Sequence, residues 1–330
     1  MISISRTPLR VSFFGGGTDY PEYFQRAPGA VVGMAINKYV YISALRLASV
    51  VDYRYRLSYS NIETVGCSDD LRHPVVRSVF RHYEVQEALD LSIMADLPSR
   101  SGLGSSSSFT VGLLNLVHTL QNRTITKLDL ARTAVFVERE LLAENVGVQD
   151  QFHAAFGGLN RFDFEGERVR ITPIPMTGPC QQAFTSSLFL LYTGVTRFAS
   201  ETLQEQMDRT RGGKVDAELS HLLTLTGQAV TVLESGDPDS MLREFGAMLH
   251  EGWETKKRLS SKVSNPDIDA LYEAALYAGA LGGKLCGAGS GGFLLMLVPP
   301  ERQANFRQKM GDATIIPLGM DTVGSTILNP

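Results

Sequence analysis

The sequence has little cysteine and no apolar stretch near the roughly 20 residues that span a bilayer. Its three cysteines, Cys67, Cys180 and Cys286, are too few and too far apart for a disulfide framework or a zinc-binding pattern. The first residues contain no apolar run followed by a cleavage site. We therefore expect a cytoplasmic protein without a membrane partner.

The sequence also has no large excess of one charge. It contains 31 Lys and Arg and 35 Asp and Glu, which gives a net charge of -4. This balance gives no overall attraction to nucleic acid, which we do not expect as a partner. Hydrophobic residues make up 43% of the 330 residues, enough for a sizeable core and too many for a disordered chain. The length predicts two domains.

Glycine is abundant, with 31 residues that cluster at 15–17, 102–104 and 282–292. Clustered glycine marks tight turns or places where a ligand approaches the backbone closely. A single cluster would favour a simple turn. Three clusters, each beside an apolar segment, favour ligand-binding loops.

Apolar periodicity predicts a mixture of strands and helices. Strands are expected at 9–14, 30–36, 39–45, 53–59, 91–95, 188–192, 292–298, 314–318 and 323–328. Helices are expected at 74–83, from the serine cluster to about 120, and at 127–143, 214–234, 238–259 and 266–279. This mixture predicts an α+β protein. A turn-rich stretch at 173–179 suggests the boundary between two domains, 1–178 and 179–330.

The strongest local signal is the segment DLPSRSGLGSSSS at 96–108, between a predicted strand and a predicted helix. Free N–H groups at a helix start, together with glycines, form a site for phosphate. One serine would suffice as a helix cap, so four in a row favour an anion site. The chain has no Walker A spacing, no G-x-S-x-G elbow at these serines and no dinucleotide-binding glycine pattern with its acidic residue.

Three motifs in order resemble those of the GHMP kinases, the superfamily of galactokinase, homoserine kinase, mevalonate kinase and phosphomevalonate kinase. They are TPLRVSFFGGGTDY at 7–20, PSRSGLGSS at 98–106 and KLCGAGSGG at 284–292. The resemblance implies a ribosomal S5 domain 2-like N-terminal domain, a ferredoxin-like C-terminal domain, and ATP between them. The ATP-binding residues that it implies are Pro98, Gly102, Leu103, Gly104, Ser105, Ser106, Ser107 and Ser108.

Two acidic residues, Glu138 and Asp150, lie twelve residues apart. Alone, Glu138 would read as an exposed helix acid and Asp150 as a helix N-cap. GHMP kinases that resemble galactokinase show this spacing between a magnesium-binding glutamate and a catalytic aspartate. The resemblance implies that Glu138 and Ser106 bind Mg²⁺ and that Asp150 accepts or orients the reacting proton. It also implies that Arg10, otherwise a surface arginine, stabilises developing charge in the reaction.

The triplet Thr18-Asp19-Tyr20 resembles the sugar-binding sequence of this superfamily, where the aspartate binds ring hydroxyls, although Asp19 also suits an Asx turn. Galactokinases carry Gly-Glu-His where this chain has three glycines at 15–17, so a larger sugar would fit. Together with QDQ at 149–151 and FGGLN at 156–160, the pattern resembles the D-glycero-D-manno-heptose 7-phosphate kinase branch. That branch phosphorylates the anomeric hydroxyl to give the 1,7-bisphosphate. The sugar-binding residues expected here are Gly16, Gly17, Thr18, Asp19, Gln149, Gly287 and Gly289.

A sugar that already carries a phosphate needs a second anion site. The candidates are Arg197, Lys256, Lys257 and Lys284, each of which has a solvated surface position as its alternative. Lys284 could contact ATP instead.

Two other functions stay open. One is a kinase for an unphosphorylated sugar such as fucose or galactose. The other is a non-catalytic GHMP-fold binding protein, which Ser106, Glu138 and Asp150 disfavour because binding alone needs neither a base nor a metal ligand. The sequence does not indicate an oligomeric state.

Overall fold

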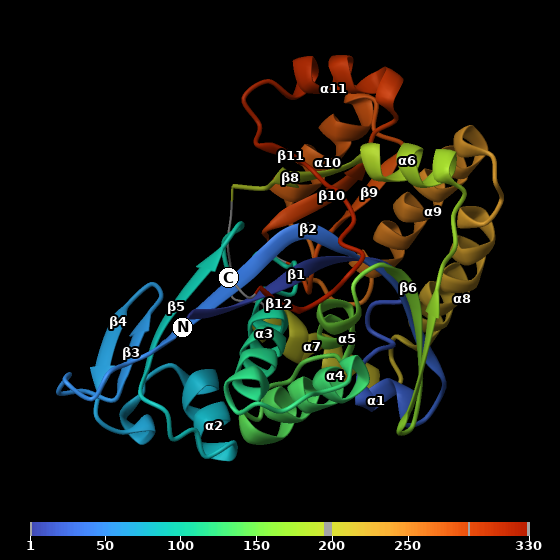
Figure 1. Ribbon diagram of the computed structural model, residues 1–330. Helices are drawn as coiled ribbons and strands as arrows, with labels where there is room; N and C mark the ends of the chain where they lie inside the picture. The colour runs from blue at the N-terminus through green and yellow to red at the C-terminus, as the bar shows by residue number, and fades with distance from the viewer. Residues whose placement is uncertain (1, 195–199, 290, 329–330) are drawn as a thin grey trace.

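The computed structural model describes residues 2–194, 200–289 and 291–328. In Figure 1, the helices α2 (Pro74–His82), α3 (Ser105–Leu120), α4 (Lys127–Phe136) and α5 (Gln149–Phe156) are among those that lie below the first sheet. A second sheet lies above it, with α10 (Pro266–Ala278) and α11 (Gln303–Met310) on its outer side. The predicted α+β class is confirmed. Within the described ranges, no helix combines the length and apolar character needed to cross a membrane.

The first sheet has eight strands: β1 (Ile2–Phe14), β2 (Gly29–Arg46), β3 (Tyr55–Ser58), β4 (Ile62–Val65), β5 (Leu89–Ala95), β6 (Leu159–Glu165), β7 (Arg168–Pro173) and β12 (Thr326–Leu328). Its order is β12-β1-β2-β5-β3-β4, and β6 joins β2 to β7. Only β3 and β5 pair in parallel among these described pairs. The last strand thus returns to the first sheet, with Leu328 opposite Ile4. The division into domains 1–178 and 179–330 stays a prediction.

Strand β2 is one element of 18 residues, where the sequence predicts two strands. The exposed Asn37 and the half-buried Lys38 interrupt the apolar pattern and suggest a turn. The chain nevertheless stays extended because β1 pairs along both halves of β2. The first half of β2 also pairs with β6 and the second half with β5.

Helix α4 begins as predicted, with the Thr126 side chain accepting a hydrogen bond from the Asp129 backbone N–H. It ends at Phe136, and the chain continues as a π-helical turn over Val137–Leu141. The sequence predicts a continuous helix over 127–143 and gives no sign of this change. The π-helical turn places Glu138 in the protein interior.

The second sheet is antiparallel with the order β11-β8-β10-β9, formed by β8 (Leu188–Tyr192), β9 (Gly282–Leu285), β10 (Phe293–Leu297) and β11 (Ile315–Pro317). The remaining helices are α1 (Pro21–Phe24), α6 (Gly178–Ser186), α7 (Ser200–Arg211), α8 (Asp216–Leu233) and α9 (Pro238–Lys257), with 3-10 turns at Ser68–Asp70 and Pro300–Arg302. Phe13 of β1 packs edge-on against Phe184 of α6 and Phe245 of α9, at centroid distances of 5.5 and 5.2 Å. The two parts of the molecule therefore share one apolar core.

Candidate active site

A cavity of about 780 Å³ brings the three sequence motifs together. It lies where the end of β1, the start of α3, the start of α5 and the turn after β9 meet. The predicted site residues that line it are Arg10, Gly16, Gly17, Asp19, Pro98, Gly102, Gly104, Ser105, Ser106, Ser107, Gln149, Asp150, Lys256, Lys284 and Gly287. Segments nearly 300 residues apart in the sequence thus face one space.

Arg10 and Asp150 form a bidentate ion pair in the wall of this cavity. The Arg10 Nε donates to Oδ1 of Asp150 at 2.8 Å, and Nη2 donates to Oδ2 at 2.6 Å. The third guanidinium nitrogen donates to the Gly102 carbonyl oxygen at 2.6 Å. The Arg10 side chain is 7% exposed and that of Asp150 is 23% exposed. Each carboxylate oxygen keeps a further acceptor position, so Asp150 can still meet a hydroxyl in the cavity.

Gly104 allows the phosphate loop to approach this ion pair closely. Its φ is +76°, and a Cβ at this position would lie 3.2 Å from both Arg10 Cγ and Asp150 Oδ2. Helix α3 begins at the next residue, so its free N–H groups lie beside the pair. This arrangement places an anion site next to a carboxylate and a fixed positive charge.

The serines after Gly104 divide between the cavity and the interior. Ser105, Ser106 and Ser107 line the cavity, and Ser106 is exposed. Ser108 is buried and donates to the Pro8 carbonyl oxygen at 2.7 Å. Leu103 is fully buried, and its carbonyl oxygen accepts the Arg10 backbone N–H at 3.0 Å. Neither Ser108 nor Leu103 lines the cavity, and both residues hold the loop on β1. Their expected ATP contacts stay predictions.

Glu138 is 1% exposed, and its two carboxylate oxygens have different surroundings. Oε2 accepts from Ser107 Oγ at 2.9 Å and from Gln151 Nε2 at 2.5 Å. Oε1 has no partner among the described residues. Burial raises the pKa of Glu138 to about 7, and the nearby Thr110 hydroxyl together with the hydrogen bonds from Ser107 and Gln151 offsets only part of that increase. The Thr110 hydroxyl itself donates to the Ser106 carbonyl oxygen at 3.2 Å.

These surroundings fit a Mg²⁺ site that is completed by phosphates. In the described part of the chain, no group of three or more His, Cys, Asp or Glu residues could hold a metal ion. Mg²⁺ commonly takes only one or two protein carboxylates and completes its shell with phosphate and water oxygens. Glu138 does not itself line the cavity, but its unpartnered buried oxygen lies next to Ser107, which does, and is a suitable ligand of this kind.

Asp19 is buried in the cavity wall, whereas the neighbouring Thr18 is part of the turn. Asp19 Oδ1 accepts the Gly17 N–H at 2.9 Å and Oδ2 accepts the Gln149 N–H at 3.4 Å. Burial raises the pKa of Asp19 above its usual value. The Thr18 hydroxyl donates to the Gly15 and Ala30 carbonyl oxygens, and Thr18 does not line the cavity. The Thr18 hydroxyl therefore has a structural role here, and the sugar contact expected of this residue stays a prediction.

Two buried lysines enter the cavity from the C-terminal half. Lys284 Nζ donates to the Phe13 carbonyl oxygen at 2.9 Å, and burial lowers its pKa to about 8. Lys256 Nζ donates to the carbonyl oxygens of Leu285 and Gly287. Burial, and then the nearby Lys284, lower the pKa of Lys256 well below its usual value. Both ammonium groups would gain from an anion in the cavity.

Three other expected substrate contacts are not part of this lining. Lys257 Nζ lies 2.8 Å from Glu254 Oε1 and 5.7 Å from the centre of the Trp253 ring, outside the cavity. Gly289 packs against the Val263 backbone, also outside it. The substrate contacts expected of these two residues stay predictions, although a helix face and a tight turn direct both residues away from this cavity. Arg197 lies outside the described residues.

The apolar end of the cavity is not predicted from the sequence. It is lined by Val40, Tyr59, His73, Val75, Ile93, Met94, Leu97 and Phe109. The His73 ring contacts the rings of Tyr59 and Phe109, at centroid distances of 5.1 and 4.9 Å. A flat, apolar space of this kind suits a nucleobase. Its residues come from separate strands, helices and loops, so no local pattern could have identified them.

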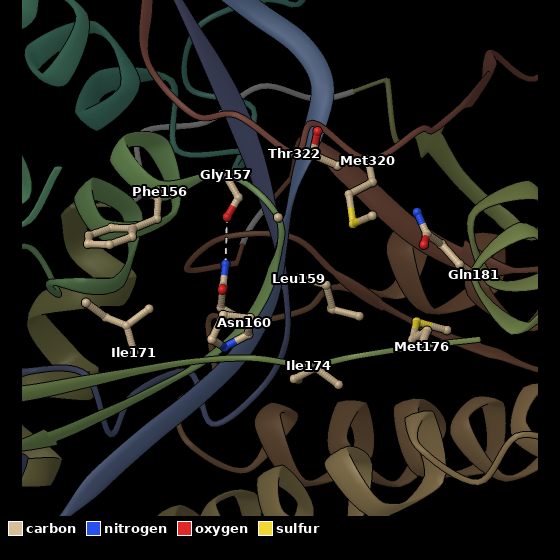
Figure 2. A pocket seen from close by; sticks show the side chains of 12 residues that line it. Phe156, Gly157, Leu159, Asn160, Ile171, Ile174, Met176, Gln181, Met320 and Thr322 are labelled. Atoms are coloured by element: carbon tan, nitrogen blue, oxygen red, sulfur yellow. Dashed lines mark hydrogen bonds between the residues drawn. The ribbon is translucent and has the colours of Figure 1, made fainter. Parts of the chain in front are cut away.

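A second cavity, of about 590 Å³, contains the FGGLN segment at 156–160 (Figure 2). There Asn160 Nδ2 donates to the Gly157 carbonyl oxygen at 2.6 Å. The Gly158 N–H donates to the Asp321 carbonyl oxygen at 2.6 Å, which ties this turn to the strand-like segment before β12. This cavity includes none of the predicted catalytic residues. The FGGLN segment thus supports the fold here rather than the first cavity.

Comparison with known proteins identifies the family. The sequence matches the GHMP kinases N terminal domain over residues 71–158 and the GHMP kinases C terminal domain over residues 239–315. It is 28% identical to the D-glycero-alpha-D-manno-heptose 7-phosphate kinase of Campylobacter jejuni, over 91% of each chain. It is 25% identical to the galactokinase of Pyrococcus furiosus, over 94% of this chain and 92% of that one.

The solved structures agree in fold. A D-glycero-D-manno-heptose 1-phosphate kinase from Bacteroides thetaiotaomicron superposes with a TM-score of 0.75 at 24% identity, over 99% of each chain. Lactococcus lactis galactokinase with galactose gives a TM-score of 0.75 at 19% identity, over 98% of this chain and 95% of that one. GHMP kinases use ATP, typically with Mg²⁺. The chain belongs to the GHMP kinase family.

Proposed function

We propose that this GHMP kinase is an ATP-dependent sugar kinase that phosphorylates the anomeric hydroxyl of D-glycero-D-manno-heptose 7-phosphate to give the 1,7-bisphosphate. The observation that carries the proposal is the Arg10–Asp150 pair, which lies beside the start of α3 in the cavity shared by the three motifs. The substrate class is supported by the relative from Campylobacter jejuni, which is named a heptose 7-phosphate kinase.

The ATP end of the cavity combines the phosphate loop with the apolar space around His73. The N–H groups at the start of α3 and the hydroxyls of Ser105 and Ser106 bind the phosphates, and the apolar space takes the base. Glu138 and Ser106 hold the metal ion. Bound Mg²⁺ neutralises charge on the β- and γ-phosphates.

At the acceptor end, Asp150 accepts or orients the proton of the sugar hydroxyl. The hydroxyl oxygen bonds to the γ-phosphorus of ATP, the bond from that phosphorus to the bridging oxygen breaks, and ADP leaves. The proton passes through Asp150 to water. Arg10 fixes the orientation of the Asp150 carboxylate and places positive charge beside the transferring group.

The sugar lies against Asp19 and Gln149, whose Oε1 has no partner among the described residues. Its distal phosphate meets Lys256 or Lys284, the two buried lysines among the described lining residues. Lys284 retains contact with ATP as its alternative role. Arg197 stays a candidate for the same phosphate on sequence grounds alone.

The proposal is tested by measuring ATP consumption with heptose 7-phosphate, heptose, fucose and galactose as acceptors. We expect kcat/KM to be highest for heptose 7-phosphate. Equal use of heptose and heptose 7-phosphate would remove the reason for a distal phosphate site and would favour a kinase for a free sugar. Binding of ATP and sugar without turnover of any acceptor would favour a non-catalytic binding protein.

A further inference from the structure

We propose that Ser107 and Gln151 are positioning residues that orient the Glu138 carboxylate for the metal ion of the nucleotide complex. The inference rests on the proposed ATP-dependent function and gives Ser107 and Gln151 a role in that site beyond the one expected from the sequence. Ser107 was expected to contact ATP, and Gln151 was not expected to contribute.

Both residues donate to one and the same carboxylate oxygen. Ser107 Oγ lies 2.9 Å and Gln151 Nε2 lies 2.5 Å from Oε2 of Glu138. The donors belong to different helices, α3 and α5, while Glu138 belongs to the π-helical turn. A glutamate carboxylate otherwise rotates freely about its last torsion. Two donors from two helices fix that rotation and leave Oε1 as the remaining oxygen.

The free oxygen argues against a purely structural role for this carboxylate. Burying a charged acceptor without a partner is costly, so buried carboxylates normally have both oxygens bonded. Glu138 is 1% exposed, yet Oε1 has no partner among the described residues. A cation that completes its coordination with phosphate oxygens would satisfy this oxygen. The arrangement is therefore a preformed ligand whose orientation depends on Ser107 and Gln151.

The neighbouring serines then have separate roles. Ser106 is exposed to the cavity and is free to meet the nucleotide or the metal directly. The Ser107 hydroxyl is occupied by Glu138. Partners that hold a metal ligand in place typically change metal affinity by roughly 10- to 100-fold when they are removed.

The test uses Mn²⁺ as the probe metal and a non-hydrolysable ATP analogue with the full-length protein. Electron paramagnetic resonance measures Mn²⁺ affinity in the nucleotide complex, and calorimetry measures analogue affinity without metal. We expect Ser107→Ala and Gln151→Met each to weaken Mn²⁺ binding by roughly 10- to 100-fold. Metal-free analogue affinity should stay within about twofold, and Ser107→Thr, which keeps the hydroxyl, should restore Mn²⁺ affinity.

A matched control and a double variant separate positioning from general damage. Thr119→Ala removes a hydroxyl from the same helix that bonds only the Asn115 carbonyl oxygen in the described contacts, so it should leave Mn²⁺ affinity unchanged. In a Glu138→Gln background, adding Ser107→Ala should have no further effect, because both changes act through one carboxylate. If only one of the two single variants folds, that variant carries the test.

Unchanged Mn²⁺ affinity in the folded variants would overturn the inference. So would an equal loss of metal-free analogue binding. The proposed function fails separately, if the wild type binds no nucleotide or turns over no sugar. If the wild type turns over a sugar but the variants bind Mn²⁺ as tightly as the wild type does, only the positioning roles of Ser107 and Gln151 are rejected.

Discussion

Arg10 and Asp150 are 140 residues apart in the sequence and are joined by two parallel hydrogen bonds of 2.8 and 2.6 Å in the cavity wall. The arginine is the more buried partner and the aspartate the more open one. This geometry holds the carboxylate by one side and leaves it accessible to an acceptor hydroxyl. It therefore separates two effects that mutation can test, proton acceptance by Asp150 and orientation by Arg10.

Asp150→Asn keeps the shape of the side chain but cannot accept the proton. A single general base contributes roughly 10²- to 10⁴-fold, so we expect kcat to fall by that factor with ATP affinity largely kept. Steady-state kinetics and nucleotide binding by calorimetry measure the two quantities. Asp163→Asn, which changes a half-exposed carboxylate paired with Arg161, serves as the control and should keep full activity. Activity of Asp150→Asn within a few-fold of wild type would reject the assignment.

Arg10→Lys keeps the charge but loses the planar pair of donors. We expect kcat to fall by about 10²-fold, the size of effect seen when one preorganised donor is lost. The surface pair of Arg26 and Asp216 has the same bidentate geometry, at 2.9 and 2.6 Å, so Arg26→Lys is a matched control. Equal activities of the two lysine variants would show that the Arg10 geometry has no catalytic role.

The pKa of Glu138, about 7 in the folded protein, predicts two effects of pH. Below pH 7 the carboxyl binds a proton that competes with a metal ion, so apparent Mg²⁺ affinity should rise as the pH increases from 6 to 8. Without metal, the folded state binds more protons than the unfolded state between about pH 4.5 and pH 7. Its free energy of unfolding should therefore fall as the pH rises through this range.

Glu138→Gln tests both effects because it cannot titrate. At pH 8 without metal, we expect it to raise the free energy of unfolding by up to about 3 kcal/mol, a gain that disappears toward pH 4. Urea unfolding at several pH values measures this difference. A gain of the same size at pH 4 and pH 8 would contradict the raised pKa as its cause.

Lys256→Ala should weaken binding of heptose 7-phosphate by roughly 10- to 150-fold, the range for a hydrogen bond to a charged group. Its effect on unphosphorylated heptose should be small, because that sugar lacks the distal phosphate. Lys257→Ala should affect neither sugar, since Lys257 pairs with Glu254 outside the cavity. KM and kcat for both sugars measure the contrast. Equal losses for both sugars would indicate damage to the fold or to the ATP site.

The three motifs can be recognised in the sequence because each depends on residues that are close together in the chain. The Gly-Ser segment must start a helix, and Gly104 has a positive φ and close contacts that a side chain would disturb. The predicted strands and helices overlap observed ones, but β4, β6, β7, β9, α1, α5, α6, α7 and α11 are not predicted from the sequence. The π-helical turn at 137–141 has no local signal either, and β2 is continuous because β1 pairs along both of its halves.

The direction of a side chain is a second feature that the sequence does not predict. Lys256 and Lys257 are adjacent in α9, and the sequence could not decide which of them faces the cavity. Thr18 and Ser108 have hydroxyls that suit a ligand, yet backbone carbonyl oxygens occupy both. The apolar end of the cavity and the contact between Gln151 and Glu138 depend on elements that meet only in the folded chain.

The central claim is that the wild-type protein transfers phosphate to the anomeric hydroxyl of a sugar that already carries a distal phosphate. Phosphorus NMR of the product from ATP and heptose 7-phosphate tests it most directly. We expect a bisphosphate with two sugar phosphate signals, one of them coupled to the anomeric proton. A new phosphate on any other hydroxyl, or no bisphosphate at all while a free sugar is phosphorylated, would contradict it.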